Sequence, residues 1–126
     1  LLALRYAGSA TLLTPGDPEV FVFPRLGPPW FDAGADDAGA LAAALDEDGG
    51  LWLVPTEGDP RLDGRFPDAT AVDATSAGGA VVGEREALVV VAADGAVQRF
   101  RREAGPVVDL AVSPDDQLVA LGGSTG

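Results

Sequence analysis

Residues 107–121, which read VVDLAVSPDDQLVAL, carry the clearest strand and turn signals of the chain. Two short apolar segments, Val107–Val112 and Gln117–Leu121, flank Ser113-Pro114-Asp115-Asp116. Pro presets the second position of a β-turn and Asp favours turns, so this stretch predicts two antiparallel strands joined by a tight turn. Working outward from it, we find the same order of strand, turn and strand further upstream.

Two overlays indicate an internal repeat. Ala74–Val82 aligns with Ala111–Val119 at a shift of 37 residues, and Leu45–Leu51 aligns with Val91–Val97 at a shift of 46. The first overlay implies strands at Ala69–Thr75 and Ala80–Val82. Unequal shifts on either side of about 40 residues are typical of a degenerate repeat with loop insertions.

The segment from residue 87 to residue 101 predicts a hairpin. Ala87–Ala92 is continuously apolar, as expected for a strand buried on both faces in the middle of a sheet. Asp94-Gly95 supplies the turn, because Gly tolerates positive φ and Asp bonds within its own turn. Ala96–Arg101 follows as a strand that alternates between apolar and polar residues.

The first half of the chain gives weaker signals. Ala10–Thr14 and Glu19–Pro24 predict two further strands, and Ala40–Leu45 predicts a third, with a helix of one or two turns as the alternative because Ala favours helix. The long stretch Arg25–Gly39 is expected to be an irregular connection. Thr56–Pro67, rich in Gly, Pro, Asp and Arg, is expected to be an extra loop.

These residues resemble a known family. Val108–Ala120 is similar to the first two strands of a WD40-type β-propeller blade, an apolar strand, Ser-Pro-Asp-Gly and a second apolar strand. Asp94–Phe100 resembles the turn and strand that end in that family's Trp-Asp pair. The resemblance covers roughly the second half of the chain, since residues 1–68 match only in strand rhythm.

The chain departs from that family at several positions. Phe100-Arg101 and Val54-Pro55 stand where Trp-Asp would be, and Asp116 replaces the turn Gly. Because the chain contains no His, the family's Gly-His element and its His-to-Asp hydrogen-bond network are missing. The sequence therefore indicates a propeller-like repeat outside the strict WD pattern.

The resemblance implies an all-β fold of antiparallel four-stranded blades, with about three blades forming an incomplete propeller. The 17 Gly and 10 Pro already argue against a helical bundle. We expect residues 1–126 to form a single repeat region with approximate units 1–32, 33–68, 69–105 and a truncated 106–126. Propellers typically close with four to eight blades, so we expect a fragment of a longer chain that needs further blades or another subunit.

Composition excludes several functional classes. Without His or Cys, the chain lacks Ser-His and Cys-His nucleophile systems, Cys/His zinc sites and disulfides. A formal charge of -12, with 20 acidic residues against eight Arg, disfavours nucleic acid and anionic membranes and suits a basic protein partner. No apolar run approaches the roughly 18 residues that span a bilayer, so we expect no membrane insertion.

The chain's beginning lacks an initiator Met, a basic leader and a long apolar segment, so we expect its natural N-terminus to be missing. Localisation is therefore left open, with the cytoplasm slightly favoured. Abundant Ala, Gly, Pro and Arg without Lys suits a GC-rich bacterial genome.

The acidic group Asp46-Glu47-Asp48-Gly49-Gly50 admits two interpretations. Carboxylates before a Gly are typical of a calcium loop, and Glu57 follows Asp46 by eleven residues. However, Leu51 occupies the sixth position, where an EF-hand requires Gly. The overlay on Asp94-Gly95 favours a hairpin turn, and whether calcium binds near Asp46 and Asp48 is left open.

Three further groups invite a chemical interpretation. Asp36-Asp37 and Asp115-Asp116 are paired carboxylates suited to acid-base work, but both lie in turn-like sequence and are expected to be solvated. Gly122–Gly126 is Gly-rich like a phosphate loop, yet it lacks the Lys of that motif and reads as a turn with no strand after it.

Arginines and aromatic residues supply the remaining candidates. Arg99, Arg101 and Arg102 form a basic cluster that could clamp an anion or an acidic partner, or could guard a strand edge beside Glu103. Trp30-Phe31 and Trp52 are expected to anchor the core or loops more often than to form a binding surface. We assign no residue to catalysis, to a cofactor or to a metal.

We therefore expect a non-enzymatic, WD40-like module that serves as a protein-protein interaction scaffold within a larger protein. Partners are expected to meet rim loops, with Thr56–Pro67 and Arg25–Gly39 as the longest candidates. The alternative is part of a propeller hydrolase or lactonase whose channel holds a divalent metal through carboxylates. A lectin-like or extracellular ligand-binding repeat is a third possibility.

Overall fold

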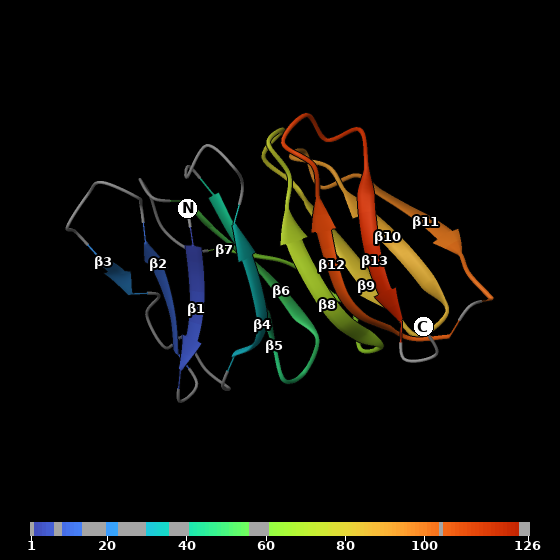
Figure 1. The fold of residues 1–126 in the computed structure, drawn as a ribbon, viewed down its shortest axis with the longest axis horizontal. Helices are drawn as coiled ribbons and strands as arrows, with labels where there is room; N and C mark the ends of the chain where they lie inside the picture. Colours follow the sequence, from blue (N-terminus) through green and yellow to red (C-terminus); the bar gives the residue numbers. More distant parts are fainter. Residues whose placement is uncertain are drawn as a thin grey trace.

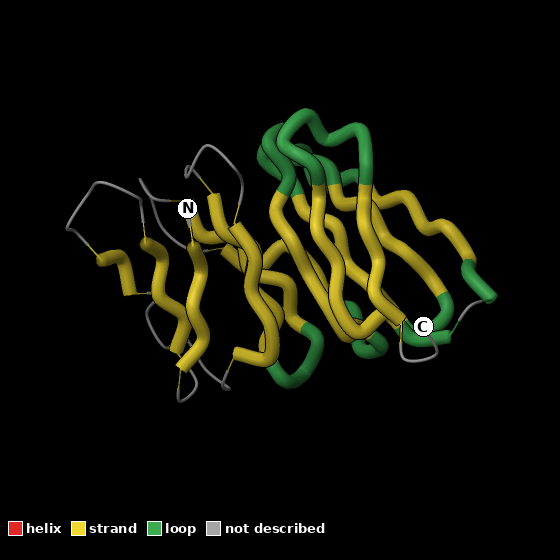
Figure 2. Tube along the Cα trace, in the orientation of Figure 1, coloured by secondary structure: helices red, strands yellow, loops and turns green. Residues whose placement is uncertain are grey.

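The computed structural model describes the backbone of residues 2–6, 9–13, 20–22, 30–35, 41–55, 61–103 and 105–123. Side chains are described for residues 32–34, 41–55, 61–103 and 105–123. All regular structure in these ranges is β-strand, and the strands form four antiparallel sheets that follow one another along the molecule (Figures 1 and 2). No helix of the described residues is long and apolar enough to cross a membrane.

Each sheet is a meander of consecutive strands. The first sheet contains β1 (Leu2–Tyr6), β2 (Ser9–Leu13) and β3 (Val20–Val22). The second contains β4 (Trp30–Ala35), β5 (Leu41–Asp46), β6 (Gly50–Pro55) and β7 (Arg61–Arg65). The third contains β8 (Ala69–Ala74), β9 (Ala80–Glu84), β10 (Ala87–Val91) and β11 (Val97–Arg101). The fourth contains β12 (Val107–Val112) and β13 (Val119–Gly123).

The sheets stack through their first strands. Strand β4 contacts β1 and β2, strand β8 contacts β4 and β5, and strand β12 contacts β8 and β9. The first strands of the second, third and fourth sheets thus each pack against the first two strands of the preceding sheet. This is the way in which propeller blades stack, and the chain is an all-β, incomplete propeller-like fold with two four-stranded blades among its four sheets.

The first strands also share a local irregularity. In β4, β8 and β12 the register with the following strand shifts between the first and the third residue, at Trp30/Asp32, Ala69/Ala71 and Val107/Asp109. A bulge bends a strand and increases its twist. The same bulge near the start of β4, β8 and β12 supports a common repeat unit, although the three strands differ in sequence.

Apolar side chains fill the two interfaces between the second, third and fourth sheets. Between the second and third sheets the buried cluster comprises Ala43, Leu45, Leu51, Leu53, Phe66, Val72, Ala74, Ala80, Val82, Val89 and Val91. Between the third and fourth sheets Ala71, Val81, Val107 and Leu110 form a smaller cluster, against which Leu88 and Val90 pack. Strand β10 therefore packs on both faces, which confirms the prediction made from its continuous apolar run.

Several predicted strands are confirmed. Strand β12 has the predicted bounds, Val107–Val112, and β10 and β11 differ from the prediction by one residue. The Ala-rich segment forms strand β5, so its helical alternative is wrong. Burial overrides the helix propensity of Ala here, because Ala42, Ala43 and Ala44 are fully buried between neighbouring strands.

Two predicted loops contain strands. The expected irregular connection Arg25–Gly39 includes β4, and the boundary placed between units 1–32 and 33–68 lies inside this strand. The expected extra loop Thr56–Pro67 includes β7, which forms the edge of the second sheet. Strand β7 (RLDGR) is a charged edge strand, and β4 (WFDAGA) combines two aromatic residues with Asp, Ala and Gly, so neither shows the usual apolar strand pattern.

Two register predictions are also corrected. The final strand is β13 (Val119–Gly123) rather than Gln117–Leu121, because Gly122 and Gly123 pair with β12. The overlay at a shift of 46 matches the turn between β5 and β6 with the turn between β10 and β11, which are different turns of their sheets. A short Asp-Gly turn fits any tight hairpin, so it does not define the repeat register.

Candidate functional site

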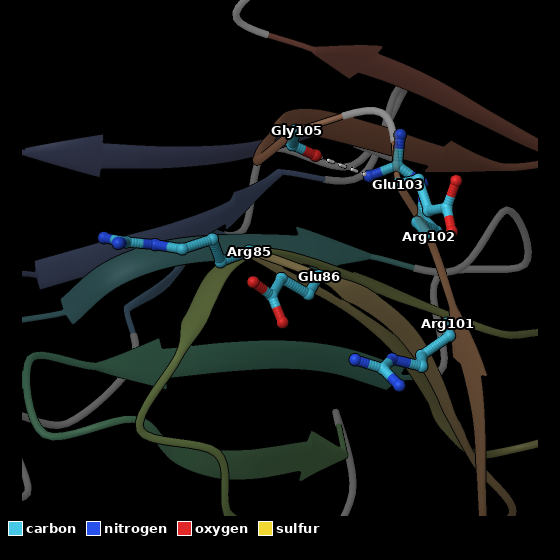
Figure 3. A pocket seen from close by; sticks show the side chains of 6 residues that line it. All are labelled: Arg85, Glu86, Arg101, Arg102, Glu103 and Gly105. Atoms are coloured by element: carbon cyan, nitrogen blue, oxygen red, sulfur yellow. Dashed lines mark hydrogen bonds between the residues drawn. The ribbon is translucent and has the colours of Figure 1, made fainter.

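A pocket of about 570 Å³ opens at one rim of the third sheet. It lies between the turn from β9 to β10, which carries Arg85 and Glu86, and the segment from the end of β11 to the start of β12. The lining residues are Arg85, Glu86, Arg101, Arg102, Glu103 and Gly105 (Figure 3). Three guanidinium groups against two carboxylates make this pocket locally basic on a chain of net charge -12.

Arg102 builds the wall of this rim pocket. Its backbone N–H donates to the carbonyl of Glu86 at 2.7 Å, and its Nη1 donates to the carbonyl of Gly105 at 3.0 Å (Figure 3). Gly105 takes φ +81°, which is the left-handed region that favours Gly. These bonds hold the β11 to β12 connection against the β9 to β10 turn.

Arg85 and Arg101 are free to bind. Both side chains are exposed, and among the described residues neither guanidinium group makes an ion pair or a hydrogen bond. Each guanidinium carries five N–H donors in a planar fork that matches a carboxylate. The pocket can therefore bind an acidic group without first breaking an existing ion pair.

Arg99 has a different role from its neighbours in the predicted basic cluster. Its Nη2 and Nε lie 2.7 and 3.1 Å from Oε1 of Glu84, a residue that is only 7% exposed. This ion pair lines another pocket of about 470 Å³, which shares Arg85, Glu86 and Arg101 with the rim pocket. Arg85 is a further member of the basic group, because the pairing of Ala87 with Arg101 between β10 and β11 brings the turn that carries Arg85 close, and no spacing along the chain signals it.

A second group of polar side chains lies along the first strands. Asp32 Oδ2 accepts a hydrogen bond from the backbone N–H of Val72 at 3.0 Å, which links the second sheet to the third. Asp73 Oδ2 accepts one from Val112 at 2.9 Å, which links the third sheet to the fourth. Each carboxylate thus joins its own first strand to the next one.

The environment of Asp73 is unusual. Burial raises the pKa of its carboxyl group, and the charges of Asp32 and Asp109 raise it further, against the lowering effect of the bonds from Val112 and Ala74. Gly34 makes this packing possible, since a Cβ at that position would collide with the Asp73 carboxylate and backbone. Close approach of β4 and β8 therefore accounts for a Gly in the middle of a strand.

Asp46 organises its hairpin through all of its oxygen atoms. Oδ1 accepts hydrogen bonds from the N–H groups of Asp48 and Gly50 at 2.9 and 2.8 Å, and Oδ2 accepts one from Trp52 Nε1 at 3.0 Å. The turn interpretation of Asp46–Gly50 explains these bonds, and Trp52 acts as the loop anchor that was expected. Glu57 lies outside the described residues.

Asp115 and Asp116 form different hydrogen bonds, one within their own turn and the other to the third sheet. Asp115 accepts bonds from Ser113 and Gln117 of its own turn, which lower the pKa of its carboxyl group. Asp116 has φ +59°, in the left-handed region that favours Gly, and its two carboxylate oxygens accept the N–H groups of Ser76 and Ala77. Asp116 therefore ties the last turn to the preceding blade.

The remaining candidates from the sequence either belong to strands or lie outside the described residues. Gly122 and Gly123 belong to strand β13 and not to a phosphate loop. Asp36-Asp37 and residues 124–126 lie outside the described residues, as do the side chains of Trp30-Phe31. Within the described part of the chain no group of three or more Asp or Glu side chains is arranged to hold a metal ion.

Comparison with known proteins adds no assignment. Neither a protein-family model nor a curated protein matches this chain.

Proposed function

We propose that this chain is a non-enzymatic, WD40-like interaction module of a larger bacterial protein, and that its rim pocket binds an acidic segment of a partner protein. The observation that carries the proposal is the pair Arg85 and Arg101, whose guanidinium groups are exposed and unpaired among the described residues. On a chain with 20 acidic residues, two unpaired Arg in one pocket favour a ligand that carries carboxylates.

The size and shape of the pocket support a peptide. A volume of about 570 Å³ lies in the range of small-ligand sites, roughly 300–1,000 Å³, yet the lining is charged rather than apolar. Glu86 and Glu103 in the same lining, together with the strongly negative chain, disfavour a polyanion such as nucleic acid. A short segment with one or two Asp or Glu side chains matches this balance of charge.

The test measures binding of a fluorescent Asp/Glu-rich peptide to the chain by fluorescence anisotropy at low salt. Replacing both Arg85 and Arg101 by Ala is expected to weaken binding about tenfold or more, because each removes a charge-assisted hydrogen bond. Arg61→Ala is the matched control, since Arg61 pairs with Asp63 at 3.6 Å and lies outside the pocket. Equal loss in the control, or preference for a Lys/Arg-rich peptide, contradicts this site.

The alternative function is a propeller enzyme with a carboxylate-held metal in its channel. The observation that bears on it is that the charges of Asp32 and Asp109, on the neighbouring first strands, both raise the pKa of the Asp73 carboxyl group. Their oxygens, however, already accept backbone N–H groups, with Asp73 using both. We therefore place the binding module first.

A further inference from the structure

The rim pocket continues into its neighbour, and together they form one groove. The pockets of about 570 and 470 Å³ are both lined by Arg85, Glu86 and Arg101. The lining residues that the two pockets do not share are Arg102, Glu103 and Gly105 at one end and Asp68, Glu84, Ala87 and Arg99 at the other. The shared residues therefore lie in the middle of this combined site, here called the rim groove.

The end of the rim groove next to the turn between β7 and β8 carries free negative charge. The buried Glu84 pairs there with Arg99, with 2.7 Å between Oε1 and Nη2, so these two charges offset each other. Asp68 lies on the turn before β8 and is exposed. Among the described residues its carboxylate makes no ion pair or hydrogen bond, so it can bind a cation without losing a partner.

The middle of the rim groove favours one carboxylate rather than several. The side chains of Arg85 and Arg101 come from the turn between β9 and β10 and from β11 (Figure 3). Glu86 is exposed in the same lining, and its charge opposes a second acidic side chain there. The charge of -12 on the chain likewise repels a strongly acidic segment.

We propose that the rim groove binds a segment of mixed charge, in which an Asp or Glu side chain meets Arg85 and Arg101 and a nearby Lys or Arg side chain meets Asp68. This inference rests on the proposed function and narrows the partner from acidic segments in general to segments that also carry a positive charge. The added cation pairs with Asp68 and reduces the repulsion between the segment and the chain. Arg99 does not compete for the carboxylate of the segment, because its Nε and Nη2 already donate to Glu84.

The spacing of the two charges follows from the shape of an extended segment. Alternate side chains of an extended chain share one side and lie roughly 7 Å apart, whereas adjacent side chains point to opposite sides. Both charges must face the same groove, so the basic residue is expected two positions from the acidic one. A Lys adjacent to the acidic residue is expected to point away from the groove and to add little.

The experiment measures fluorescence anisotropy of labelled peptides at about 0.15 M salt, where charges more than roughly 8 Å apart are largely screened. Three peptides carry one Asp in a Ser/Gly background: one without Lys, one with Lys two positions away on both sides, and one with Lys adjacent on both sides. The second is expected to bind about threefold more tightly than the first, which is the strength of one exposed ion pair. The third has the same charge as the second and controls for long-range attraction.

Asp68→Asn is expected to abolish this preference without weakening the binding of the peptide that lacks Lys. Asp94→Asn is the matched control, because it removes the same charge at the other end of β10, outside both pockets. The Asn side-chain oxygen can still accept the N–H of Ala96, as Asp94 Oδ1 does at 2.9 Å. Circular dichroism checks that each variant is folded.

The outcomes separate this inference from the proposed function. Equal binding of the three peptides overturns the mixed-charge inference, and so does a preference that survives Asp68→Asn or that Asp94→Asn also abolishes. In each of these cases the proposed function stands if replacing both Arg85 and Arg101 by Ala still weakens binding. If no peptide binds, or if that double replacement changes nothing, the proposed function fails and this inference fails with it.

Discussion

At the scale of single residues, Asp carboxylates form the hydrogen bonds that join turns and sheets of this chain. Asp32 and Asp73 join successive blades, Asp46 closes a hairpin, and Asp116 ties the last turn to the third sheet. Each accepts backbone N–H groups, which satisfies donors that strand pairing leaves over. Much of the acidity that looks like surface charge in the sequence is therefore structural.

The pKa values of Asp73 and Asp115 are expected to differ from the ordinary Asp value in opposite directions. Burial raises the pKa of Asp73, and bonds from its own turn lower the pKa of Asp115. As pH falls, folded Asp73 takes up its proton before the unfolded chain does. Its contribution to stability therefore grows as pH falls through the folded pKa toward the ordinary Asp value, and is constant below that. Carboxyl NMR titration checks both directions, and a midpoint for Asp73 below that for Asp115 contradicts the packing described.

Arg99 and Arg101 lie two residues apart on β11 and are expected to differ in their effect on stability. Arg99→Ala leaves the buried Glu84 carboxylate without its partner, which is expected to cost about 1 kcal/mol once solvent screening of the half-exposed Arg99 is allowed for. Arg101→Ala removes no bond and is expected to stay within about 0.5 kcal/mol of wild type. Urea unfolding of the two variants measures the difference, and equal losses would show that the ion pair contributes nothing.

At the scale of elements, the first strands decide how blades pack. Strand β4 contains Asp32 and Gly34 between aromatic and Ala residues, and at Gly34 it closely approaches the Asp73 carboxylate and the backbone of β8. Strand β7 is charged because it forms a sheet edge. Local composition thus reports the position of a strand within its blade as much as its secondary structure.

Gly34→Ala is expected to destabilise the fold by about 1–3 kcal/mol, because the new Cβ would overlap the Asp73 carboxylate and the backbone of β8. Gly95→Ala is the comparison. Its Cβ meets no atom within 4 Å, so only the positive φ of 90° opposes it, at a cost of about 1 kcal/mol. Thermal melting of both variants tests the order, and a smaller loss for Gly34→Ala would rule out close packing of β4 on β8.

At the scale of the whole molecule, the excess of negative charge opposes the compact state. With a formal charge of -12, repulsion between carboxylates is long-ranged and is screened by salt. Three of the eight Arg line the rim pocket against two Glu, so its lining carries an excess of positive charge. Partner choice and stability are therefore both expected to depend on ionic strength.

We expect the melting temperature to rise with sodium chloride, and calcium chloride at equal ionic strength to give the same rise. The oxygens of Asp46 already accept three hydrogen bonds, and no described group of carboxylates is arranged around a cation. Differential scanning calorimetry in the two salts makes the comparison. An additional rise specific to calcium, reversed by a chelator, would support the metal-holding alternative.

The all-β class, the tight turns and most strands of the second half can be predicted from the amino-acid sequence, because alternation, Pro and Asp-Gly act locally. The sequence also indicated the basic cluster, but without Arg85 and without the separation of Arg99 from Arg101. The folded chain alone reveals that β4 and β7 are strands, which overlay is in register, and that Asp32 and Asp73 each bond the first strand of the following sheet. Those features depend on contacts between residues about 40 positions apart, such as Asp32 with Val72, and such contacts leave no trace in local composition.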